Sequence, residues 1–150
     1  MKTDRSAASY RWLLLAPLCV SASACAGECV PQVRDGWIRM LPGAMPMMAG
    51  FGRIENRCPT PAAIVDARSA AFADTSLHET TVVEGVSRMR AVPELRIAPN
   101  GAAVLQPGGL HLMLMQPRVP LQAGTTIQVD FALKDGGTLR GRLLVRADAP

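Results

Sequence analysis

Apolar and polar residues alternate with a period of two along most of the chain after residue 30. Nine segments carry this alternation: residues 33–41, 50–56, 63–71, 76–83, 86–92, 102–105, 110–115, 126–133 and 138–145. Turn-forming residues such as Glu84-Gly85 separate them, at intervals of about 8–12 residues. No helical period of apolar residues extends beyond about eight residues. The pattern therefore predicts an all-β fold, a sandwich or barrel of short, mainly antiparallel strands.

The first 24 residues differ from the rest and predict a secretory signal peptide. Lys2, Arg5 and Arg11 make a basic start, residues 12–20 are apolar, and residues 21–24 are small. The apolar stretch is too short to serve as a stable membrane span. We expect cleavage after Ala24 or after Ala26. Residues 27–150 contain no linker and no internal repeat, and we expect them to form a single domain.

Cys25 gives the leader a second interpretation. In a lipoprotein signal the leader would end before Cys25, which would become the acylated first residue and anchor the protein to a membrane by lipid. Ala22 lies three residues before it, where such signals usually have Leu. The sequence therefore favours ordinary cleavage and leaves lipidation open. Both interpretations predict export, and we expect a periplasmic protein.

Composition limits the classes that remain. Apolar residues make up 49% of the chain and charged residues 19%, which excludes a disordered chain. The formal net charge of +4 falls to about +2 without residues 1–24. The remaining arginines are interleaved with acidic residues, so we expect no nucleic-acid partner.

Two cysteines are placed for a disulfide. An exported chain meets an oxidising compartment, in which cysteines are expected to pair. Cys29 precedes the first predicted strand and Cys58 follows the second. A Cys29–Cys58 bridge would close a loop of about 30 residues, typically worth about 2–4 kcal/mol. No Cys-x-x-Cys spacing supports the alternative of a redox pair or a thiolate metal site.

Two methionines accompany a histidine in the segment Leu110-His111-Leu112-Met113-Leu114-Met115. If this segment is a strand, its leucines face the core and His111, Met113 and Met115 share the opposite face. An imidazole and two thioethers on one outward face are not typical of core packing.

The other histidine, His78, is separated from Met89 by a predicted hairpin turn at Glu84-Gly85. A two-residue turn puts Thr80 opposite Met89, and His78 and Met89 become diagonal neighbours about 7–8 Å apart at Cα. A three-residue loop would place them on opposite faces. We predict the two-residue turn.

The two pairs make a candidate ligand set of His78, Met89, His111 and Met113. Thioether sulfur selects Cu(I) over zinc, calcium or magnesium, and neutral imidazole also suits this ion. Because both histidines must be neutral to bind, we expect copper affinity to fall below pH of about 6.

The spacing of these residues resembles a known family. Ten residues separate His78 from Met89, twenty-one separate Met89 from His111, and one separates His111 from Met113. This is the pattern of the PCuAC family of periplasmic copper chaperones, which the chain resembles over about residues 33–146. The resemblance implies a cupredoxin-like β-sandwich that binds Cu(I) through these four residues. It also implies delivery by ligand exchange to a copper-site subunit of cytochrome c oxidase or to a thiol-containing copper carrier.

Two features depart from this family. Many relatives carry a His- and Met-rich C-terminal segment thought to hold Cu(II), and the residues after Arg146 contain neither His nor Met, so a Cu(II) role is not supported. Met45, Met47 and Met48 instead gather after the first predicted strand. With Met115 they are candidates for auxiliary soft-metal ligands, although a flexible apolar loop is the favoured interpretation of this cluster.

Other functional classes find less support. A blue-copper electron carrier needs a cysteine ligand near its histidines, and no such motif is present. An enzyme is not expected, because the sequence has no Ser-His-Asp, HExxH or paired-carboxylate pattern. A plain protein-binding sandwich leaves the motif unexplained. A periplasmic copper scavenger or buffer, without a dedicated oxidase partner, would use the same four ligands and stays open as the alternative.

Overall fold

The computed structural model describes residues 29–43 and 45–147, and every regular element among them is a β-strand. The signal peptide, its cleavage sites and Cys25 lie outside these residues. The strands are β1 (Gln32–Arg39), β2 (Met47–Asn56), β3 (Ala62–Arg68), β4 (Phe72–Val83), β5 (Val86–Ala91), β6 (Leu95–Ile97), β7 (Gly101–Leu105), β8 (Leu110–Pro117), β9 (Thr126–Leu133) and β10 (Thr138–Arg146).

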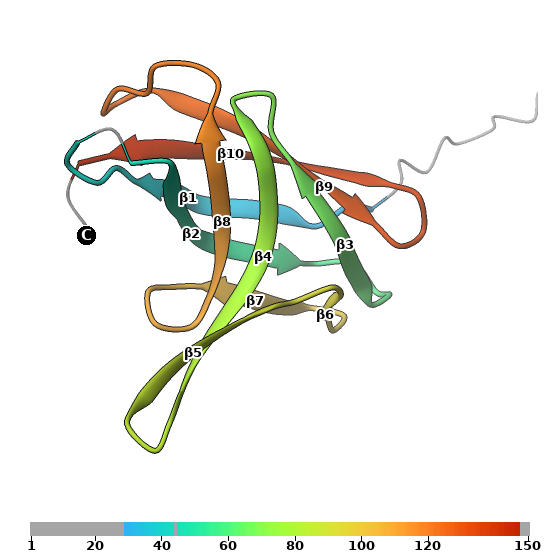
Figure 1. Ribbon diagram of the computed structural model, residues 1–150. Helices are drawn as coiled ribbons and strands as arrows, with labels where there is room; N and C mark the ends of the chain where they lie inside the picture. The colour runs from blue at the N-terminus through green and yellow to red at the C-terminus, as the bar shows by residue number, and fades with distance from the viewer. Residues whose placement is uncertain (1–28, 44, 148–150) are drawn as a thin grey trace, which may run out of the picture.

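The ten strands form one mixed sheet in the order β5-β4-β8-β2-β1-β10-β9-β3-β6, with β7 also paired to β2. All pairings are antiparallel except that of β1 with β10. The sheet bends so that β4 and β8 cross in front of β1 and β10 (Figure 1). The expected all-β, mainly antiparallel fold is confirmed.

The core fills the space inside this bend. On β8, Leu112 and Leu114 are almost completely buried, and so are Val129 and Phe131 on β9. The residues that alternate with the two leucines on β8 face the other way, as the sequence predicts. One face of β8 therefore stabilises the fold, and its other face is available for chemistry.

Several strand bounds differ from the expected ones, and one strand was not expected. The strand β6 was not predicted, because three residues between Pro93 and Pro99 are too few to show an alternation. The strand β4 begins at Phe72 rather than at residue 76. The strand β2 begins at Met47, directly after Pro46, so Met47 and Met48 belong to a strand and not to the expected loop.

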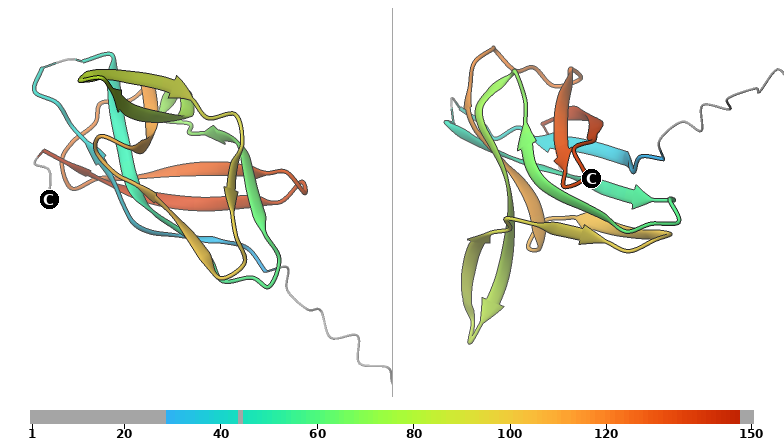
Figure 2. Two further views of the ribbon diagram at one scale, coloured as in Figure 1. Left: turned by 90° about the horizontal axis from the view of Figure 1, so that it is seen from below. Right: turned by 90° about the vertical axis from the view of Figure 1, so that its right-hand side faces the viewer.

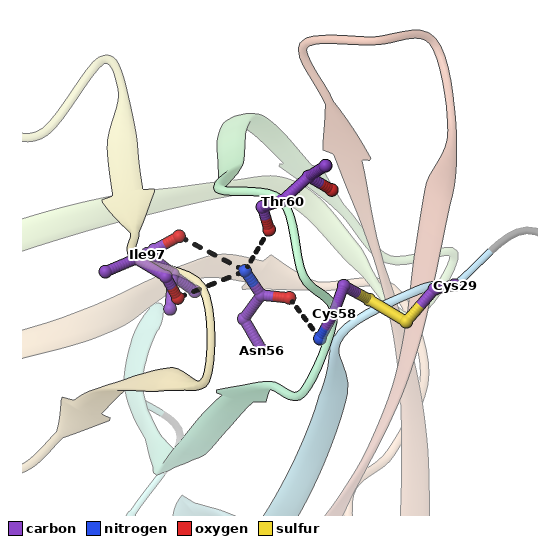
Figure 3. Close-up of a disulfide and its surroundings, with 6 residues drawn as sticks. Cys29, Asn56, Cys58, Thr60 and Ile97 are labelled. Carbon is purple, nitrogen blue, oxygen red and sulfur yellow. Dashed lines mark hydrogen bonds between the residues drawn. A yellow bond between two sulfur atoms is a disulfide. The ribbon is translucent and has the colours of Figure 1, made fainter.

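A disulfide and a buried amide join the ends of several strands (Figure 3). Cys29 and Cys58 are bonded, with their Cα atoms 5.7 Å apart. Beside them, the Asn56 side chain is completely buried. Its Nδ2 lies 2.9–3.3 Å from the carbonyl oxygens of Thr60, Ile97 and Ala98, and its Oδ1 accepts a hydrogen bond from the Cys58 N–H. Asn56 thus provides hydrogen-bond partners for the backbone groups where β2, β6 and the loop after Cys58 meet.

No helix in the described ranges is both long and apolar enough to cross a membrane.

We predict that Asn56→Asp lowers the free energy of unfolding by about 3 kcal/mol, because a carboxylate would face three carbonyl oxygens without water. Urea denaturation measures the change. The matched variant Asn100→Asp lies at an exposed turn and should leave stability nearly unchanged. Equal losses in the two variants would contradict this role for Asn56.

Candidate metal centre

The pairing of β4 with β8 brings the two histidines together. In the antiparallel register His78 lies directly opposite His111, and Ser76 lies opposite Met113. The ring centroids of the two histidines are 6.2 Å apart, and their planes are inclined by 33°. Residues 33 positions apart in the sequence therefore offer two imidazoles on one face of the sheet.

The hairpin turn between β4 and β5 carries Met89 to the same face. Val83 pairs with Val86 around Glu84 and Gly85, which have φ angles of 52° and 78°. Positive φ at both central positions is typical of a type I′ turn, the tight two-residue turn that matches strand twist. The expected two-residue turn is present.

The resulting register places Thr80 opposite Met89 and His78 opposite Ala91. Met89 is thus the diagonal neighbour of His78, a separation of about 7–8 Å. The hairpin projects beyond the rest of the sheet (Figures 1 and 2), and 51% of the Met89 surface is exposed. Met89 is the most accessible member of the candidate set.

The orientation of His111 leaves one ring nitrogen available. Its Nδ1 lies 2.9 Å from the carbonyl oxygen of Gly109, which also accepts the Thr80 N–H. Since a carbonyl oxygen can only accept, Nδ1 carries the proton and the lone pair of a neutral ring lies on Nε2. A backbone partner of this kind commonly fixes the tautomer of a metal-binding histidine.

An aromatic row holds the His111 ring from the side opposite His78. The Phe51 ring centroid lies 6.5 Å from His111 and 4.6 Å from Trp37. The Arg39 guanidinium lies over both Trp37 and Phe51, at 5.6 and 5.3 Å from their centroids. His111 is consequently only 8% exposed although it points away from the core. Sequence analysis missed Phe51 and Arg39 as supports, because only the β1–β2–β8 register shows their proximity.

His78 is only partly buried, and its Nε2 lies 3.1 Å from the Ser76 hydroxyl. Burial lowers the pKa of His78 below its ordinary value, and the neighbouring His111 lowers it further, while Asp74 acts in the opposite direction. The lowered pKa favours the neutral form of His78, which is the form that binds metal ions.

Met113 lies on the same face of the sheet as the two histidines. It is partly buried on β8, two residues from His111 and opposite Ser76, the hydrogen-bond partner of His78. The register thus gathers all four sequence candidates, His78, Met89, His111 and Met113, on one face of three adjacent strands.

The auxiliary methionine candidates do not form one group. Met48 is 9% exposed and packs in the core, on the opposite face of β2 from Met47. Met45 lies before β2 and borders, with Met40 and Met48, a separate cavity of about 590 Å³. Met47, in contrast, pairs directly with Met115 on the histidine face.

The donor set around the histidines is soft. The described part of the chain contains no group of three or more His, Cys, Asp and Glu side chains that could hold an ion. Glu79, beside His78 in sequence, points to the other face and pairs with Arg90 at 2.6 Å. Two imidazoles and two thioethers suit a soft monovalent ion, and they suit calcium or magnesium poorly.

Comparison with known proteins gives a family match over residues 31–145, to the model described as "Putative lipoprotein LpqE-like". A relative named "Putative lipoprotein Lxx21020", from Leifsonia xyli subsp. xyli, is 36% identical over 108 residues, or 71% of this chain. The chain spans 64% of the length of that relative.

Solved structures share the fold, and PCuAC domains are among them. Cu(I)-bound DR1885 from Deinococcus radiodurans superposes with a TM-score of 0.64 at 26% identity, covering 85% of this chain and 86% of that one. The apo form of the same protein gives 0.62 at 26% identity, over 98% and 97%. The copper-bound PCuAC domain from PmoF2 gives 0.63 at 16% identity, over 77% and 92%, which concerns the fold alone. The cupredoxin-like class expected from the sequence is thereby confirmed.

We predict that His111→Gln raises the pKa of His78, because the variant removes the neighbouring imidazole that lowers this pKa. Asp74→Asn should lower it, because that variant removes a favourable negative charge. NMR titration of the His78 ring protons measures both shifts. A His78 pKa that stays constant in both variants would contradict the described electrostatics.

Proposed function

Because the chain belongs to the LpqE-like family and shares the fold of PCuAC domains, we propose that it is an exported copper chaperone that binds Cu(I) and gives it to a partner protein. One observation carries the proposal. His78 lies directly opposite His111, with Met89 and Met113 beside them on the same face. The Cu(I) form of DR1885, with 26% identity, supports the choice of metal.

The four proposed ligands divide into two kinds. The His111 ring is held by the Gly109 carbonyl and the Phe51 ring, so it would keep its position with and without copper. Met89 stands on the projecting hairpin with half of its surface exposed. Thioethers are weak, uncharged ligands, and Met89 and Met113 would leave the ion first. The histidines hold the ion and the methionines govern its exchange.

Transfer would proceed by ligand exchange. A cysteine thiolate or thioether of the partner enters the exposed side of the ion before Met89 leaves, so copper is never released into water. Copper stays Cu(I) throughout, and no bond within the protein is made or broken. Binding and release, rather than catalysis, is the activity that these residues support.

The proposed recipient is the copper-site subunit of cytochrome c oxidase or a thiol-containing copper carrier. Either would present soft sulfur ligands that can compete for Cu(I). A copper scavenger or buffer remains the second candidate, and the open position of Met89 favours the chaperone because a storage site gains nothing from an exposed ligand. The proposed location is the periplasm, and the LpqE-like match supports export, with a lipid anchor at Cys25 as the alternative to cleavage.

We predict that the purified protein binds Cu(I) at this face and that His78→Ala or His111→Ala abolishes tight binding. Met89→Leu and Met113→Leu should weaken affinity at least tenfold, or about 1.4 kcal/mol, because leucine fills the same volume without a donor sulfur. An anaerobic titration against a chromophoric Cu(I) chelator measures all four.

Met45→Leu is the matched control, because Met45 is also about half exposed but borders a different cavity. It should bind copper as the parent protein does. Unchanged Cu(I) affinity in both histidine variants would overturn the proposed site. An equal loss of affinity in Met45→Leu and Met89→Leu would also contradict it, because exposed methionines would then contribute to binding wherever they lie.

A further inference from the structure

The histidine face continues along β8 into a second group of soft donors. Met47 on β2 lies directly opposite Met115 on β8, and both side chains share the face of His111 and Met113. We propose that Met47 and Met115 form a second, weaker Cu(I) site, which takes up the ion and feeds it through Met113 to the histidines. The histidine site need not hold copper for this second site to exist.

The strand register brings the two thioethers within reach of one ion. Directly opposed residues of antiparallel strands have Cβ atoms about 4.5–5.5 Å apart. The three rotatable bonds of methionine let two sulfurs converge from that separation. Along β8, Met115, Met113 and His111 succeed one another at steps of two residues, about 6.8 Å each. Soft donors thus occur at regular intervals between the two sites.

The exposure of Met47 supports a role in binding. Two consecutive methionines on β2 differ strongly in exposure. Met48 is 9% exposed and lies in the core, whereas Met47 is 40% exposed and lies on the outer face. Packing explains Met48 but not an exposed thioether opposite another methionine. The next residue on that face of β2 is Ala49, opposite Met113, which is itself only partly buried.

Charge on the same row favours a cation. Asp74 on β4 lies opposite Met115, so the register gives the sequence Met47, Met115, Asp74 across three strands. Two positively charged residues lie on the next row, on the side of β2 that faces away from β8. Arg39 on β1 lies opposite Ala49, and Arg146 on β10 lies opposite Arg39. The exposed carboxylate is a poor ligand for Cu(I), but its negative charge lowers the energy of a cation held by uncharged sulfurs.

Two thioethers make a weaker site than two imidazoles with two thioethers, and this difference gives the transfer its direction. An ion captured at Met47 and Met115 exchanges one sulfur for Met113 and then reaches His111 Nε2. Each step replaces one neutral ligand by another, with no change in the oxidation state of copper.

The test is an anaerobic titration of the protein, labelled with ¹³C at the methionine methyls, with Cu(I) followed by NMR. We expect the first equivalent to shift the Met89 and Met113 methyls and the second to shift those of Met47 and Met115. The double variant Met47→Leu/Met115→Leu should bind one equivalent instead of two. Leucine has a similar volume and both positions are outside the core, so the fold should be retained.

Two further variants separate this proposal from the proposed function. In His78→Ala/His111→Ala the first event should disappear, while the Met47 and Met115 methyls still shift, which tests the second site by itself. Met47 and Met115 methyls that do not move under excess Cu(I) would overturn the second site and leave the histidine site untouched. Shifts at Met45 and Met48 instead would place weak binding in the cavity before β2 and would also overturn it.

Discussion

The candidate centre depends on the register of one strand, β4, with its two neighbours. Pairing with β8 sets His78 opposite His111, and pairing with β5 sets Met89 diagonal to His78. The side-chain period of a strand is two, so a slip of one residue on either side would send half of the ligands to the other face. The core prevents the first slip, because Leu77, opposite Leu112, is fixed among buried residues. The type I′ turn at Glu84-Gly85 prevents the second.

His111 and Met89 differ in how firmly their surroundings hold them, and this difference suits the capture and release of an ion. His111 has a backbone hydrogen bond on Nδ1, an aromatic neighbour and little exposure. Met89 has half of its surface in solvent and stands on a hairpin outside the main body of the sheet. A histidine held as firmly as His111 preorganises a site, because little ordering remains for the ion to induce. Accessible, weakly binding methionines let a partner's sulfur enter. One sheet face thus combines affinity with exchange.

Sequence patterns predict much of this arrangement. Alternation along residues 110–115 assigns the histidine and methionines of β8 to one face, and the hairpin turn assigns Met89, because both depend on local geometry. Relations between distant strands are harder to predict. The pairing of Met47 with Met115 and the position of Phe51 beside His111 depend on the β2–β8 register, which no local pattern specifies. Pro46 and the run of methionines indicate a loop, whereas tertiary pairing extends β2 to Met47. The burial of Asn56 depends likewise on where β6 comes to lie.

The most direct test of the proposed centre is X-ray absorption at the copper edge of the protein loaded with one equivalent of Cu(I). The first coordination shell reports the ligand types without any substitution that could disturb the sheet. We predict a shell of two nitrogen and two sulfur donors, the nitrogens with the multiple-scattering pattern of imidazole. A shell of sulfur alone would place copper on the methionines without the histidines, and a shell of nitrogen and oxygen alone would exclude Met89 and Met113. Either result would contradict a centre built on the register of β4.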